Sequence, residues 1–119
     1  MKLFAHEKYY GLNEEDEPFH FLYFRDNVKD FVFSLTRMKA SSKIEIMVKD
    51  QIIDSVEDLD CKIDSDFFSA KVPESLQKYL AEEKYTIEVK HDCDTEEIES
   101  LKAALRQIFK GKNGLKEET

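Results

Sequence analysis

The segment Phe19–Arg25, with the sequence FHFLYFR, constrains the fold of this 119-residue chain more than any other segment. Apolar side chains occupy both the odd and the even positions of the segment. A strand with one face in solvent would instead alternate apolar and polar residues. The segment is therefore predicted to be a strand that lies inside a sheet and is covered on both faces. Asp26 and Asn27 supply turn residues, so residues 28–36 are expected to pair back as a hairpin.

Shorter alternating segments surround this hairpin. Strands are predicted over residues 2–12, 43–48, 51–53, 59–63, 67–72 and 85–89. Helical signals come late: Pro73 suits the first position of a helix over residues 73–82, and Asp94 with Glu97 has capping-box spacing before a helix over residues 95–109. We expect an α+β fold, with an antiparallel β-sheet of about six to seven strands and the two C-terminal-half helices packed on one face.

The length of the chain predicts a single α+β domain over residues 1–109, because 119 residues support one compact core. Residues 110–119 hold one apolar side chain and are expected to form a flexible C-terminal tail. The N-terminal residues lack the apolar core of a signal peptide, and no run is long enough to span a bilayer, so a cytoplasmic location is expected. Cys61 and Cys93 are expected to be free and largely buried thiols.

The charge balance restricts the class of partner. Asp and Glu number 26 against 18 Lys and Arg, which gives a formal net charge of -8 and a pI near 4.9. Such a chain is repelled by nucleic acid and by anionic membrane surfaces, so we expect neither as a partner. A basic protein surface is the expected electrostatic complement.

Two acidic tracts could supply that contact: residues 14–17 and residues 54–66. In the second tract Leu59, Cys61 and Ile63 alternate with charged residues, which predicts a strand with an apolar inner face and an acidic outer face. Phe67 and Phe68 follow as candidate anchors. The predicted partner-binding residues are Glu14, Glu15, Asp16, Glu17, Asp54, Glu57, Asp58, Asp60, Asp64, Asp66, Phe67 and Phe68. The alternative is a solvated surface that only confers solubility.

Patterns for catalysis and metal binding are weak in this chain. A calcium loop starting at Asp58 fails at Lys62 and Ile63, and His91 with Cys93 lacks the paired spacing of a zinc site. No nucleophile elbow or glycine-rich phosphate loop is present. We therefore expect no catalytic residues, no metal and no cofactor, and a protein that is not an enzyme. A small carboxylate-dependent hydrolase stays open as an alternative.

Several short motifs resemble a known family. They are Gly11-Leu12 before an acidic loop, Phe21–Arg25, Ile44-Glu45-Ile46 leading to Asp50-Gln51, and Ile87-Glu88-Val89 before a helix that ends at Ile108-Phe109. In this succession the chain resembles bacterial immunity proteins of polymorphic-toxin and contact-dependent growth inhibition systems, most closely immunity protein family ten. It departs from that pattern at Phe24, where a polar residue is expected.

The resemblance implies a cytoplasmic protein that binds and neutralises a cognate toxin domain without catalysis of its own. With the charge balance, it predicts a toxin inhibitor that holds a basic domain, such as a nuclease, through an acidic surface. Reversing Asp58, Asp60 and Asp64 to lysine is then expected to abolish protection and to leave the fold intact. The alternative function is an acidic secretion chaperone or adaptor that binds a segment of an effector.

Overall fold

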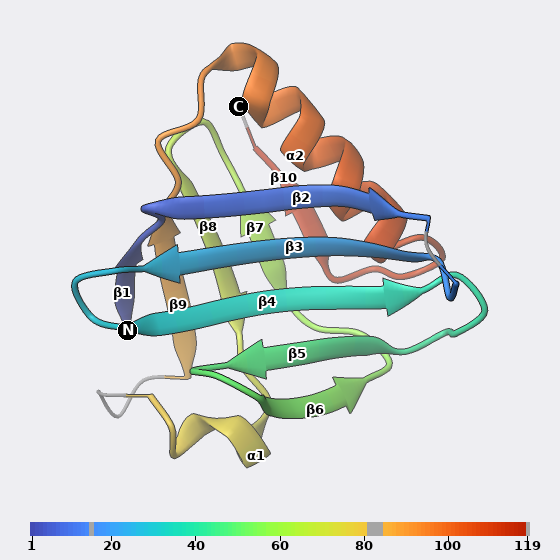
Figure 1. Ribbon diagram of the computed structural model, residues 1–119, viewed down its shortest axis with the longest axis horizontal. Helices are drawn as coiled ribbons and strands as arrows, with labels where there is room; N and C mark the ends of the chain where they lie inside the picture. The colour runs from blue at the N-terminus through green and yellow to red at the C-terminus, as the bar shows by residue number, and fades with distance from the viewer. Residues whose placement is uncertain (15, 81–84, 119) are drawn as a thin grey trace.

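The computed structural model describes residues 1–14, 16–80 and 85–118, and its strands form two five-stranded sheets (Figure 1). The front sheet has the order β2-β3-β4-β5-β6, and all neighbouring strands in it are antiparallel. Its strands are β2 (Glu7–Asn13), β3 (Phe19–Asp26), β4 (Phe31–Met38), β5 (Ile44–Val48) and β6 (Ile52–Val56). Each strand pairs with its neighbour in sequence, as short connecting loops favour.

The back sheet has the order β1-β9-β8-β7-β10. Its strands are β1 (Lys2–Phe4), β9 (Thr86–Lys90), β8 (Phe67–Lys71), β7 (Cys61–Ile63) and β10 (Leu115–Glu117). The central strands are antiparallel, whereas β1 runs parallel to β9 and β10 runs parallel to β7. The predicted α+β class is confirmed, with more strands than expected and with those strands divided between two sheets.

The core lies between the inner faces of the two sheets. Leu22 and Phe24 of β3 stand opposite Leu35 and Phe33 of β4, and all four side chains are fully or almost fully buried. Phe68 of the back sheet contacts this layer, with its ring centroid 5.6 Å from that of Phe24 and 5.7 Å from that of Phe33. These aromatic contacts hold the two sheets together.

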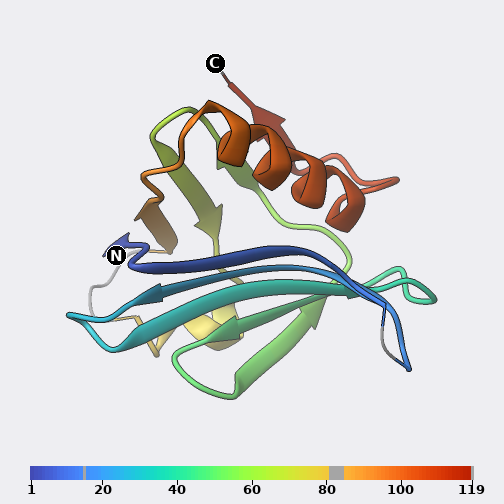
Figure 2. The same ribbon diagram turned by 45° about the horizontal axis from the view of Figure 1, so that its top comes forward.

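The helices lie at opposite ends of the molecule, and not on one face as predicted (Figures 1 and 2). Helix α2 (Thr95–Ile108) begins at the predicted capping box of Asp94 and Glu97, and it packs against β2, β3, β4 and β10. Helix α1 (Glu74–Gln77) contacts β6 and is shorter than the predicted helix over residues 73–82, of which 81 and 82 lie outside the described residues. Neither helix is long and apolar enough to cross a membrane.

The single strand predicted over residues 2–12 is divided between the two sheets. Ala5 N–H donates to the Lys90 carbonyl in the back sheet, and His6 N–H donates to the Arg25 carbonyl in the front sheet. The buried Asp26 carboxylate fixes this crossing, because it accepts the N–H groups of residues 4, 28 and 29 at 2.9 to 3.0 Å. Alternation alone could not reveal the crossing, since it continues through both strands.

The segment beyond α2 is not the free tail that its composition suggests. Strand β10 pairs with β7, where Leu115 stands beside Cys61 in the parallel register. The Arg106 guanidinium of α2 donates two hydrogen bonds to the Glu117 carboxylate, at 2.9 and 2.6 Å. A segment with one apolar residue can be ordered in this way because backbone hydrogen bonds and charged side chains, and not apolar burial, make its contacts.

Candidate functional site

The outer face of the front sheet is turned toward the viewer in Figure 1, and no described element lies over it. Side chains alternate along β3, so Phe19, Phe21 and Tyr23 point outward while Leu22 and Phe24 enter the core. The prediction of an interior strand is confirmed, because β3 lies between β2 and β4. The prediction that β3 is covered on both faces is wrong for the described residues, which cover only its inner face.

One row of directly paired residues crosses all five strands of the outer face. The row consists of Tyr9, Tyr23, Ser34, Met47 and Ile53. Tyr9 and Ile53 are 56% and 55% exposed, and the Tyr9 and Tyr23 rings lie 5.8 Å apart. These two side chains stand at the ends of the row, and Tyr23 beside Tyr9 and Met47 beside Ile53 are partly exposed. A contiguous apolar surface of this kind marks a contact site more often than apolar residues scattered singly do. We define the front face as Tyr9, Phe19, Phe21, Tyr23, Met47 and Ile53.

Two adjoining hollows shape the front face. The first, of about 260 Å³, lies over Ser34, whose small side chain leaves space between Tyr23 and Met47. The second, of about 560 Å³, is lined by Asp16 and Glu17 together with Met38. Phe19, Thr36 and Glu45 line both hollows. An apolar hollow therefore continues into an acidic one.

The loop between β2 and β3 places the first predicted acidic tract beside the front face. Glu14, Asp16 and Glu17 are exposed, and Asp16 and Glu17 line the acidic hollow. Glu15 lies outside the described residues. The strand cation nearest the loop by register is Arg37, which stands opposite His20 and whose guanidinium donates to the carbonyl oxygens of Ile108 and Lys110. Arg37 is therefore engaged by the chain at the end of α2, and the described loop carboxylates share this end of the face with the exposed Lys39, whose N–H donates to the Pro18 carbonyl.

The second predicted tract does not form one acidic surface. Asp54 lies on the inner side of β6 and accepts hydrogen bonds from the Ser75 hydroxyl of α1 and from Ser55 N–H. These two donors lower the pKa of Asp54 below its usual value. Glu57 and Asp60 are exposed, and their carboxylates have no partner among the residues that the structure describes.

Asp58 connects the tract to the C-terminal segment. Its carboxylate accepts N–H groups from Leu59 at 2.9 Å, Asn113 at 3.0 Å and Gly114 at 3.2 Å. Gly114 approaches so closely that an added Cβ would lie 1.8 Å from the Leu59 carbonyl oxygen. Asp58 is therefore a structural residue that holds the segment leading into β10.

Asp64 shapes the turn between β7 and β8. Its carboxylate accepts N–H groups from Asp66 at 2.8 Å and Phe67 at 2.7 Å. Partial burial raises the pKa of Asp64, but the N–H groups of Phe67 and Asp66 outweigh it and hold this pKa below its usual value. The Asp66 side chain is exposed at the same turn. The tract thus spans separate places in the fold.

The two candidate anchors have opposite surroundings. Phe68 is fully buried between the sheets, so its prediction as a partner-binding anchor is wrong. Alternation turns Phe67 to the outer side of the back sheet, opposite Lys90 and 39% exposed. The inward direction of Leu59, Cys61 and Ile63 is confirmed, since all three are buried. Phe67 and the front face therefore lie on opposite sides of the core.

His91 and the two cysteines take part in packing. The buried His91 ring accepts Cys93 N–H at Nδ1, and its Nε2 contacts the Asp64 carbonyl at 2.9 Å. Burial raises the pKa of both thiols, most strongly at Cys61, which leaves them poor nucleophiles. Within residues 1–14, 16–80 and 85–118, no group of three or more His, Cys, Asp and Glu residues could hold a metal ion.

The front face was missed from the sequence, although Phe19–Arg25 carried its signal. A strand with apolar residues at both odd and even positions is expected to be covered on both faces. From the sequence, other parts of this chain were expected to cover the second face. Comparisons identify no relative: no family model, curated protein or solved structure matches the chain. The resemblance to immunity protein family ten therefore stays a prediction.

Proposed function

We propose that the chain is an immunity protein that binds and neutralises a basic toxin domain, with the front face as its contact surface. The observation that carries this proposal is the outward-facing row from Tyr9 to Ile53 beside the carboxylates of Asp16, Glu17 and Glu45. Interface centres are enriched in aromatic residues and Met, and polar rims surround them. The front face combines these two features.

A partner would supply the cover that the described chain does not. Burial of Phe19, Phe21 and Tyr23 removes apolar surface from water, which stabilises a complex by roughly 25 cal/mol per Å² before the costs of association. Aromatic side chains also lose little conformational freedom on binding, because each has two rotatable bonds. This reasoning accounts for apolar residues on both sides of β3.

Charge favours a basic partner. The net charge of -8 attracts a positively charged domain over long range, and the acidic loop places part of that charge beside the aromatic residues. A nuclease with a basic cleft is the toxin class that fits best. In this proposal the protein acts in the cytoplasm and blocks its partner by occupancy, without a cofactor and without catalysis.

The test begins with the toxin domain. Where a large secreted protein is encoded immediately upstream, its variable C-terminal domain is expressed together with this chain, and growth and binding are measured. Ile53→Lys should weaken binding by about 2 kcal/mol or more, because it places an ammonium group in the apolar contact. Val28→Lys is the matched control, since Val28 is 83% exposed on the β3–β4 turn.

Full protection by both Ile53→Lys and Val28→Lys would refute the front face as the contact surface. Protection lost in both variants, with folding retained, would place the contact elsewhere. Binding to an unfolded effector segment, and not to a folded domain, would support the chaperone alternative. Hydrogen exchange of the bound partner distinguishes these two modes, since a folded domain keeps its protected amides.

A further inference from the structure

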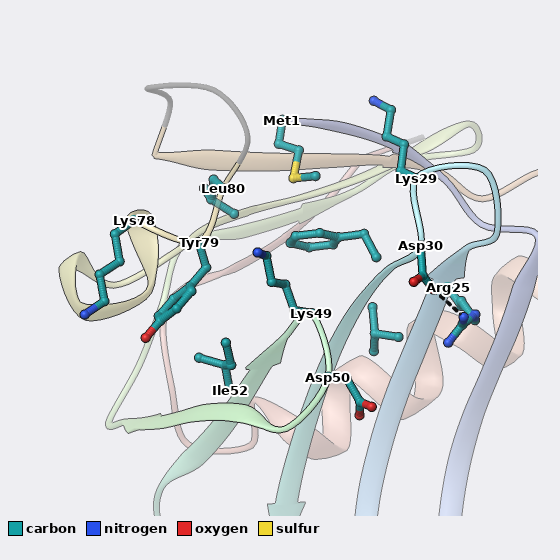
Figure 3. A pocket seen from close by; sticks show the side chains of 12 residues that line it. Met1, Arg25, Lys29, Asp30, Lys49, Asp50, Ile52, Lys78, Tyr79 and Leu80 are labelled. Atoms are coloured by element: carbon teal, nitrogen blue, oxygen red, sulfur yellow. Dashed lines mark hydrogen bonds and ion pairs between the residues drawn. The ribbon is translucent and has the colours of Figure 1, made fainter.

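Another hollow, separate from the two on the front face, lies where the β3–β4 turn, the β5–β6 turn and the chain after α1 meet (Figure 3). Its volume is about 1130 Å³. Its apolar lining includes Phe31, Ile52, Tyr79 and Leu80, of which Phe31 and Leu80 are buried in the core. Ile52 and Tyr79 are partly buried against that core. The packed core therefore holds these four lining residues in place.

The charge of this hollow is opposite to that of the whole chain. Its described lining contains the basic side chains Arg25, Lys29, Lys49 and Lys78, against the acidic Asp30 and Asp50. Arg25 is paired with Asp30, and the Lys29 ammonium donates to the Lys2 carbonyl. Two of the four cations are therefore already engaged within the protein.

Lys49 is the cation available to a ligand. In Figure 3 its side chain extends over the hollow beside Tyr79, whereas Lys78 points away on the far side of α1. The Lys78 ammonium instead lies 5.2 Å from the centre of the Tyr79 ring. Lys49 has no hydrogen-bond or ion-pair partner among the described residues, so an anion in the hollow would meet an unpaired ammonium group.

The backbone at this turn is strained. Lys49 and Gln51 have φ angles of 57° and 65°, in the left-handed region that favours glycine. Hairpin loops commonly use this region, and a lysine in this conformation costs free energy that glycine would not. The strained position is also the one that sends an ammonium group over an apolar hollow.

We propose that this hollow binds a small apolar carboxylate, with its body against Tyr79, Ile52 and Phe31 and its carboxylate on Lys49. A singly charged group suits the site, because Lys49 offers one ammonium group without a partner among the described residues and Arg25 is occupied by Asp30. A phosphate or polyphosphate requires several converging donors, usually arginine forks or backbone N–H groups. Aryl and acyl carboxylates share the required chemistry.

Two matched ligand pairs test the site on the full chain by NMR titration. The pairs are 1-naphthoate with 1-naphthamide, and octanoate with octanamide. At least one carboxylate should bind saturably and shift the amides of Lys49, Ile52 and Tyr79, with a Kd about tenfold lower than that of its amide. The pair with the tighter carboxylate distinguishes an aryl ligand from an acyl ligand.

Two substitutions of Lys49 separate binding from folding. Lys49→Gln should raise the Kd about tenfold, and Lys49→Gly should do the same while it raises the Tm, because glycine relieves the left-handed strain. Lys90→Gln is the control, since Lys90 is an exposed lysine of the back sheet. Its Kd should equal that of the original chain.

Three outcomes would overturn the proposal. They are the absence of saturable binding by both carboxylates, equal affinity for carboxylate and amide in both pairs, and an unchanged Kd in Lys49→Gln. Shifts confined to Tyr9, Tyr23 and Ile53 would likewise assign the ligand to the front face. The result is independent of toxin binding, because the titration uses no toxin and the two experiments substitute different residues.

Discussion

The two acidic tracts both gather carboxylates, but the structure gives those carboxylates different roles. In the loop at residues 14–17, Asp16 and Glu17 remain in solvent beside aromatic side chains. In the tract at residues 54–66, Asp58 and Asp64 accept backbone N–H groups that would otherwise lack a partner. A count of carboxylates cannot separate these uses, because each depends on which backbone groups come within hydrogen-bonding distance.

The comparison changes which residues test partner binding. Reversing Asp58, Asp60 and Asp64 together is now expected to weaken the fold, and not to leave it intact, because two of the three hold backbone groups. Lost protection by that variant would therefore say little about a toxin contact. The loop carboxylates, which hold no described backbone group, are the better test.

The largest effect is expected from Asp58→Ala. It should lower the free energy of unfolding by about 2 kcal/mol, since three backbone N–H groups lose their acceptor. Urea unfolding measures the change, and Asp60→Ala, at an exposed site of the same tract, should stay within about 0.5 kcal/mol. Equal midpoints for the two variants would contradict the structural role of Asp58.

A smaller and pH-dependent effect is expected from Asp64→Asn. The folded pKa of Asp64 lies below the ordinary value of 3.8, so the stabilisation by this carboxylate is present above pH 3.8 and is lost as pH falls through the folded pKa. The substitution should cost about 1 kcal/mol at pH 7 and much less toward pH 2. Unfolding at several pH values checks this, and a pH-independent cost would disprove it.

The smallest effect on stability is expected from the double substitution Asp16→Lys and Glu17→Lys. Stability should change by less than about 0.5 kcal/mol, whereas association with the toxin domain should slow about threefold at low salt and little at high salt. The control is Glu57→Lys with Asp60→Lys, which changes the net charge equally. If both pairs slow association alike, the effect is general charge and not the loop.

Local parts of the fold were predictable from the sequence. The capping box of Asp94 and Glu97 located the start of α2, and alternation located β5 and the inward side of β7. These features depend on residues within a few positions of one another, so their signal lies in a short window. The α+β class followed from their order along the chain.

The long-range features were not predictable in the same way. Pairing of β1 with β9 joins Leu3 to Val89, and pairing of β10 with β7 joins Leu115 to Cys61. Nothing in either partner's local pattern specifies the other. The same reason explains the errors at Phe68 and in the tail, since their surroundings come from distant segments. The candidate site was missed because the sequence FHFLYFR does not indicate whether this chain or a partner covers the second face of the strand.

The parallel edge strands of the back sheet imply an order of folding. Each strand of the front sheet pairs with a neighbour in sequence, so the hairpins from Glu7 to Val56 can form as soon as those residues leave the ribosome. Strand β1 must wait for β9, and β7 gains its outer partner only with β10. We therefore expect the aromatic front face to form before the core behind it is closed, which leaves the newly made chain most prone to aggregation during that interval.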